Sequence, residues 1–104
     1  MTSNYLQVWI SAEDRKQADK ILNSLLDKKL VIGGQIIMAP ARFWWKGKIV
    51  NMNYIGINTF TKKQNKEKII DDIKKTSVEE VPMISFVEFE GNKEFTDFID
   101  ETLK

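Results

Sequence analysis

The order of strand and helix patterns along the chain constrains the fold more than any other feature of the sequence. Alternating apolar residues predict strands, whereas apolar residues three or four apart predict amphipathic helices. The predicted strands cover residues 5–10, 30–37, 48–60 and 82–90, and the predicted helices cover about 12–29, a segment after Thr61 and a segment after Asn92. This order is typical of the ferredoxin-like split βαβ motif with an extra C-terminal helix. We therefore expect an α+β protein with helices on one face of an antiparallel sheet, formed by residues 1–104 as a single domain.

Polar residues predict where the helices begin. Ser11 with Asp14, and Thr61 with Gln64, have the spacing of a capping box, in which side chains bind the free N–H groups of the first helical turn. Asn92 is the expected cap of the last helix.

Glycine and proline predict the course of the two middle strands. Gly33 and Gly34 indicate a bulge or a close approach of two backbones. Pro40 indicates a bend or a position at the edge of a sheet, because proline has no N–H to give to a neighbouring strand. Lys46-Gly47 is a turn signal between two strand patterns, so we expect a hairpin there.

Both faces of the predicted sheet carry large apolar groups. In the first strand Leu6, Val8 and Ile10 point one way, and Tyr5, Gln7 and Trp9 point the other. Helices can cover only one of these faces, and leaving the other in water would forfeit several kcal/mol at roughly 25 cal/mol per Å² of apolar area. We therefore expect the second face to pack against another copy of the chain, with a different protein as the alternative partner. The residues expected at this contact, which include the aromatic end of the hairpin, are Tyr5, Trp9, Phe43, Trp44, Trp45 and Met83.

Composition excludes several classes of function. Lys plus Arg is 16 and Asp plus Glu is 15, and this balance argues against a DNA- or RNA-binding protein. The chain has no cysteine and no histidine, so thiolate and imidazole metal sites and cysteine nucleophiles are excluded. Serine nucleophiles would have no histidine to activate them. We expect no enzymatic activity.

The sequence carries no sign of membrane insertion or export. No stretch reaches the ~18 apolar residues of a membrane span. The first residues do not have a basic start followed by an apolar run, so no secretory signal is visible and a cytoplasmic location is expected.

Carboxylates are the remaining candidates for a metal site. Glu79, Glu80, Glu88 and Glu90 lie close together in sequence, and Glu88 and Glu90 share one face of a predicted strand. Carboxylate oxygens suit hard divalent cations. The simpler interpretation is that these are solvated surface acids.

Several short motifs together resemble a known family. They are Val8-Trp9-Ile10, Phe43-Trp44-Trp45-Lys46-Gly47-Lys48-Ile49, Thr61-Lys62, Glu80-Val81-Pro82 and Glu90-Gly91-Asn92. In this order and at these distances they resemble the CutA family of divalent-cation tolerance proteins, over about residues 5–103. The resemblance implies a ferredoxin-like homotrimer whose sheets face inward and whose hairpins are exchanged, and a non-catalytic metal-binding or signalling role.

The resemblance also implies a divalent cation as cofactor, copper among them. Family members tend to carry a cysteine near the position of Gly33 and His-Pro-Tyr where this chain has Ser77-Val78-Glu79. Without those groups the ligands must be carboxylate, carbonyl or thioether, and a copper site would be weaker. The residues predicted to bind metal are Glu79, Glu80 and Glu88.

A second function remains open at this point. The implied architecture is similar to that of P-II-type trimers, which bind small ligands in clefts between subunits. Arg42, Lys48 and Lys62 are the candidate residues for an anionic ligand such as a phosphate or a carboxylate metabolite. Exposed lysines without any ligand are the simpler interpretation.

Overall fold

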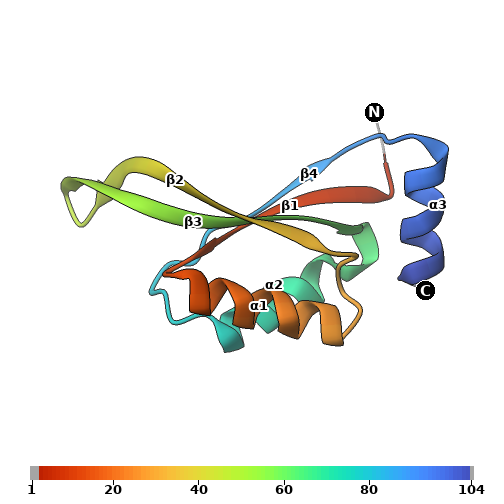
Figure 1. The fold of residues 1–104 in the computed structure, drawn as a ribbon, viewed down its shortest axis with the longest axis horizontal. Coiled ribbons are helices and arrows are strands. Elements are labelled where there is room, and N and C mark those ends of the chain that lie inside the picture. Colours follow the sequence, from red (N-terminus) through yellow and green to blue (C-terminus); the bar gives the residue numbers. More distant parts are fainter. Residues whose placement is uncertain (1–2, 104) are drawn as a thin grey trace.

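A four-stranded antiparallel sheet organises the chain. The computed structural model describes residues 3–103, and its strands lie in the order β2-β3-β1-β4. The elements are β1 (Tyr5–Ala12), α1 (Arg15–Asp27), β2 (Gly34–Trp45), β3 (Lys48–Lys62), the 3₁₀ turn η1 (Lys63–Asn65), α2 (Lys66–Thr76), β4 (Ile84–Glu88) and α3 (Lys93–Thr102). Figure 1 shows α1 and α2 side by side on one face of the sheet and α3 beyond its end. The predicted ferredoxin-like α+β fold with an additional C-terminal helix is confirmed.

The hydrophobic core lies between the sheet and the two covering helices. Val8 and Ile10 of β1 and Ile57 of β3 point toward α1, which contributes Ile21 and Leu25, and all of these side chains are fully buried. Burying each such side chain stabilises the fold by about 1.5–3 kcal/mol. This core accounts for one face of the sheet only.

The predicted starts of the first two helices are wrong. Ser11 extends β1 and is buried, and α1 is capped instead by Asp14, whose side chain accepts a hydrogen bond from the Gln17 N–H at 2.8 Å. Thr61 lies inside β3, and its hydroxyl donates to the Leu30 carbonyl at 2.5 Å. Both hydroxyls bind loop backbone or side chains at the end of a buried strand, so they do not cap a helix. Asn92 does occupy the cap position of α3, but its side chain makes no capping hydrogen bond.

The chain enters β2 later than predicted. Leu30 and Val31 are buried in a turn, so the apolar run from 30 to 33 closes the end of the core and is not a strand. Gly34 begins β2, and a Cβ there would lie 3.1 Å from Leu22 Cδ1 and 3.2 Å from the Asn58 carbonyl oxygen. The close backbone approach predicted for the glycine pair is therefore found at Gly34.

Strands β2 and β3 form a long hairpin, here called the arm where it extends beyond the covering helices (residues 40–53). Lys46 and Gly47 form its turn with positive φ angles of 49° and 80°, as a tight two-residue hairpin connection requires. Pro40 lies in β2, which is an edge strand, as predicted. The arm projects from the body of the molecule (Figure 1), whose longest dimension is 43 Å.

The last strand is shorter than the predicted segment 82–90, and aromatic rings attach the helix that follows it. Phe60 of β3 packs edge-on against Phe89 and Phe95, with ring centroids 5.3 and 5.2 Å apart. Ile99 and Leu103 are also buried, which fixes α3 across the end of the sheet. None of the helices within residues 3–103 is long and apolar enough to cross a membrane.

Candidate functional site

The second face of the sheet has no helix over it. The side chains on this uncovered face come from all four strands: Tyr5, Gln7 and Trp9 of β1; Gln35, Ile37 and Ala39 of β2; Tyr54, Gly56, Asn58 and Phe60 of β3; and Ser85 and Val87 of β4. Lys62, the last residue of β3, pairs with Tyr5 on this face and lies 3.3 Å from Asp100 at its α3 end. None of the other side chains named is charged, although charged residues make up 30% of the chain. A solvated sheet face would carry a share of those charges, so this face has the composition of a contact surface.

Trp9 occupies the middle of the uncovered face. Its ring lies over Gly56 of the neighbouring strand, where an added Cβ would stand 3.6 Å from the indole. The side chain is half-buried within its own chain. Its remaining apolar surface faces away from α1 and α2, as the sequence predicted.

The arm carries most of the exposed aromatic area. Trp44 is 72% exposed and Trp45 is 38% exposed, while Met83, near the base of the arm, is 49% exposed. Phe43 is half-buried and stacks on Tyr54 with ring centroids 5.4 Å apart. These four residues and Trp9 present apolar surface to the outside, and their place at a subunit contact stays a prediction.

Tyr5 differs from the other predicted contact residues. Its ring packs on Phe89 at 6.1 Å between centroids, and its hydroxyl donates to the Asp100 carboxylate at 2.9 Å. Those contacts are within its own chain and help to hold α3.

A polar cluster centred on Glu79 connects the segment before β4 to the base of the arm. Ser11 Oγ donates to one carboxylate oxygen of Glu79 at 2.7 Å, and Tyr54 Oη donates to the other. The Met83 N–H donates to Ser11 Oγ at 2.8 Å, and the Ser11 N–H donates to the Met83 carbonyl at 3.0 Å. Burial and the hydrogen bond to Glu79 raise the pKa of Tyr54, so its hydroxyl stays a donor at neutral pH.

Glu80 connects the segment before β4 to the turn of the arm. Its carboxylate lies 3.4 Å from Lys46 Nζ at the turn of the arm. The two adjacent carboxylates thus have different surroundings: Glu79 is oriented by two donors beside β1 and β3, and Glu80 is mostly exposed and paired with the turn of the arm.

Glu88 lies at the opposite end of β4 from this pair. It bonds to Lys63 Nζ and accepts from the Ser3 N–H at 3.2 Å. The Lys63 ammonium lowers the pKa of Glu88. The three predicted metal ligands are thus not brought together in one chain, and no group of three Asp, Glu, His or Cys residues arranged for a metal occurs anywhere in residues 3–103.

The three basic residues predicted to bind an anion are also far apart. Lys48 and Lys62 are the first and last residues of β3 and lie at opposite ends of this 15-residue strand. Arg42 donates to Asn51 across the arm. Lys62 is paired with Asp100 at 3.3 Å beside a recess of about 420 Å³.

Sequence reasoning missed the roles of Ser11 and Tyr54. Ser11 continues the two-residue alternation of residues 5–10, which was the available signal that the strand runs on and places its hydroxyl on the uncovered face. Tyr54 lies within the predicted strand 48–60, where its ring indicates nothing more than packing. Its bond to Glu79 joins residues 25 positions apart, and no local pattern predicts that contact.

Comparison with known proteins decides the family. The model of the family described as "CutA1 divalent ion tolerance protein" matches residues 6–102. The chain belongs to this family. The predicted membership in the CutA family is confirmed.

Two archaeal members are similar to this chain over nearly all of both lengths. A divalent-cation tolerance protein CutA of Archaeoglobus fulgidus is 32% identical over 98 residues, which are 93% of this chain and 96% of the relative. The CutA of Thermococcus kodakarensis is 26% identical over 97 residues, covering 92% of this chain and 93% of the relative.

A solved member shares the fold closely. The structure of a periplasmic divalent cation tolerance protein CutA from Archaeoglobus fulgidus superposes with a TM-score of 0.91 at 30% identity, covering 96% of this chain and 99% of that one.

Proposed function

We propose that this CutA protein acts without catalysis in divalent-cation tolerance, as a homotrimer that binds a divalent cation. The observation that carries the proposal is the uncovered sheet face, which bears Trp9 at its centre and has a charged side chain, Lys62, only where it meets α3. A face of this kind is stabilised when it is removed from water, and copies of the same chain offer the same face. The arm, with Trp44 and Trp45 exposed, supplies strand edges for exchange with a neighbour.

The metal-binding part of the proposal rests on Glu79 and Glu80. Glu79 is held in one orientation by Ser11 and Tyr54, and the adjacent Glu80 is paired with Lys46 and has 64% of its side chain exposed. Two carboxylates do not fill the coordination sphere of a hard cation, so water or a second copy completes it. The chain supplies only oxygen and thioether donors, which fit magnesium, calcium or manganese and do not fit a copper site of thiolate or imidazole.

Titration calorimetry tests the metal proposal. The wild-type chain is titrated with Mn²⁺, Mg²⁺ and Cu²⁺, and then Glu79→Gln and Glu80→Gln are compared with Glu67→Gln, a surface carboxylate in the first turn of α2. We expect Mn²⁺ binding that both site variants weaken at least tenfold and that Glu67→Gln leaves unchanged. Titration of Glu88→Gln tests whether the third predicted ligand binds the metal. An unchanged affinity for Mn²⁺ would show that Glu88 is not a ligand. Absence of heat with every metal would reject direct binding.

An anion sensor of the P-II type is not better supported. Arg42 and Lys62 already have partners within the chain, and Lys62 lies at the far end of β3 from Lys48. A shared site would require different copies to bring these residues together. Thermal-shift measurements against phosphate and carboxylate metabolites would detect such a site as a rise in melting temperature.

Two further predictions remain part of the proposal. The absence of catalysis is proposed because relatives are named for tolerance of divalent cations. A cytoplasmic location stays a prediction, and one similar protein is described as periplasmic.

A further inference from the structure

A recess of about 420 Å³ lies at the end of the molecule where β1 begins, β3 ends and α3 is attached (Figure 1). The residues that line it are Asn4, Tyr5, Lys62, Lys63, Gln64 and Asp100. All of these side chains carry hydrogen-bonding groups, and charges of both signs are among them. The volume falls within the range of about 300–1,000 Å³ that small-molecule sites in proteins have. The recess is therefore large enough for a small polar molecule.

The walls of the recess are held in place by contacts outside it. The Lys63 N–H donates to the Asn4 carbonyl at 2.8 Å, which joins η1 to the chain before β1. The third wall, α3, is fixed by the buried side chain of Ile99 and by the ring of Phe95, which packs edge-on against Phe60 at 5.2 Å between centroids. Because the walls are already ordered, a ligand would lose little affinity to the ordering of the protein.

An ion pair between Lys62 and Asp100 dominates the chemistry of the recess. Lys62 Nζ lies 3.3 Å from Asp100 Oδ1, and Tyr5 Oη donates to Asp100 Oδ2 at 2.9 Å. Asp100 is the single ion-pair partner of Lys62 within residues 3–103. An ammonium has three N–H donors, and each carboxylate oxygen can accept more than one hydrogen bond. Both charged groups can therefore bind a ligand without losing the partners that they have.

The charge balance of the recess disfavours a simple ion. Lys63 Nζ bonds to Glu88, which neutralises the second lysine of the wall, and Lys62 and Asp100 neutralise each other. An anion placed on Lys62 would be repelled by Asp100, and a cation placed on Asp100 would be repelled by Lys62. A molecule with one charge of each sign is attracted by both groups at once.

We propose that this recess binds a free α-amino acid. The carboxylate of the ligand contacts the Lys62 ammonium and its ammonium contacts the Asp100 carboxylate, so that opposite charges alternate around the four groups. Both charged groups of an α-amino acid are attached to one carbon atom, and this short separation matches the 3.3 Å between Nζ and Oδ1. The exposed amides of Asn4 and Gln64 supply donors and acceptors for the rest of the ligand. The site does not include Glu79, so it is independent of the proposed metal binding.

A comparison of ligands on the wild-type protein tests the proposal without any variant. Amide NMR spectra follow titrations with glycine, L-alanine, acetate, methylammonium and 4-aminobutyrate at constant ionic strength and pH 7. We expect saturable shifts of the Tyr5, Gln64 and Asp100 signals with glycine and L-alanine. Acetate and methylammonium each lack one charge, and 4-aminobutyrate holds its charges too far apart, so these three should bind at least tenfold more weakly. Equal binding of any of the three, or no saturable shift with glycine and L-alanine, would overturn the proposal.

Two variants test the residues. Lys62→Met and Asp100→Asn each remove one charge at similar size, and Asp100→Asn still offers an oxygen to the Tyr5 hydroxyl. Each should weaken glycine binding at least tenfold, with circular dichroism confirming the fold. Lys93→Met and Asp97→Asn, which remove one charge from an ion pair on α3 outside the recess, should leave glycine binding unchanged. Glycine binding that both site variants retain in full would contradict the proposal, whereas the Mn²⁺ titration decides the proposed function separately.

Discussion

The hydroxyl of Tyr54 donates a hydrogen bond to the carboxylate of Glu79. This bond connects β3, at the base of the arm, to the segment that precedes β4, and Ser11 of β1 holds the other oxygen of the same carboxylate. Three parts of the chain that are distant in sequence therefore depend on one side chain for their relative position.

Removal of that hydroxyl should destabilise the fold. Tyr54→Phe leaves Glu79 with one donor fewer, and we expect a loss of about 1–2 kcal/mol in the free energy of unfolding, measured by urea denaturation. Phe43 should keep its place on the ring, because the stacking does not need the hydroxyl. An unchanged midpoint would show that the bond contributes nothing.

The raised pKa of Tyr54 predicts a dependence on pH. A group whose pKa is higher in the folded state stabilises the fold below its unfolded pKa, about 10 for tyrosine, and this stabilisation is lost as pH rises through the folded value. Tyr5→Phe leaves Tyr54 as the single tyrosine, so ultraviolet absorbance can follow its ionisation. We expect a midpoint above 10, and Glu79→Gln in that background should bring it down. A midpoint at or below 10 would contradict the contact.

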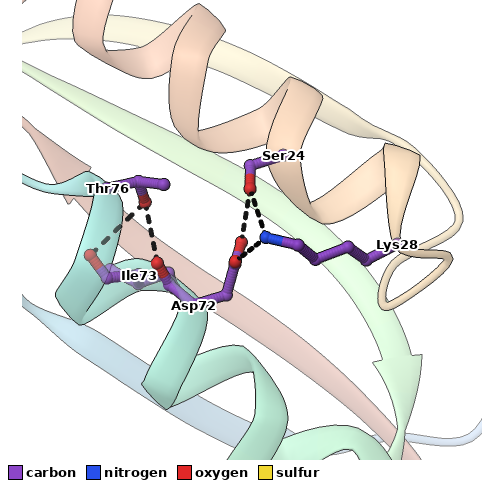
Figure 2. A network of polar contacts seen from close by, with 5 residues as sticks. All are labelled: Ser24, Lys28, Asp72, Ile73 and Thr76. Carbon is purple, nitrogen blue, oxygen red and sulfur yellow. Dashed lines mark hydrogen bonds and ion pairs between the residues drawn. The ribbon is translucent and has the colours of Figure 1, made fainter.

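Asp72 should be the most sensitive carboxylate for stability. Figure 2 shows its side chain between α1 and α2, where it accepts from Ser24 Oγ at 2.8 Å and from Lys28 Nζ, with only 6% of the side chain exposed. We expect Asp72→Ala to lower the free energy of unfolding by about 1–3 kcal/mol, since it removes both bonds from a buried position. The neighbouring exposed Asp71→Ala is the control and should change stability by less than about 0.5 kcal/mol. Equal effects of the two variants would show that the helix contact is not maintained in solution.

Gly34 should not tolerate a methyl group. A Cβ would stand 3.2 Å from the carbonyl oxygen of Asn58, which belongs to a strand backbone and cannot move aside. We expect Gly34→Ala to cost about 1–3 kcal/mol, as overpacking does in other cores. Gly56→Ala, with ordinary contacts of 3.6 Å to Trp9, should cost less in the same thermal unfolding assay. The reverse order would contradict the packing between β2 and α1.

Local patterns were sufficient to predict the architecture, and the reason is physical. Alternation along residues 5–10 assigns successive side chains to the covered and the uncovered face of the sheet. Ile21 and Leu25 are four residues apart, so a helix places both side chains on the same side, against the covered face. Helix starts were predicted less well, because hydroxyls such as those of Ser11 and Thr61 serve equally at helix caps and at strand ends.

The candidate site was harder to predict than the fold. Ser11 and Glu79 are 68 positions apart, so only the folded sheet brings them together. The separation of Glu88 from Glu79 follows from the direction of β4, which runs between them. Their nearness in sequence was therefore no guide to nearness in space.

Glu88 should titrate below an ordinary glutamate. The Lys63 ammonium and the Ser3 N–H stabilise its charged form. A carboxyl whose folded pKa is lowered stabilises the fold above its unfolded pKa and loses that contribution as pH falls through the folded value. Carbon-detected NMR titration should place Glu88 below its usual range, and Lys63→Met should raise it. A titration that Lys63→Met leaves unchanged would contradict the ion pair.

The central claim is that the uncovered face of the sheet is closed by two further copies of the chain. Light scattering on the wild-type protein at micromolar concentration tests it most directly. We expect one species with three times the 12.1 kDa mass of the chain. A single species of 12.1 kDa, with Trp9 and the arm tryptophans fluorescing as water-exposed indoles, would contradict it.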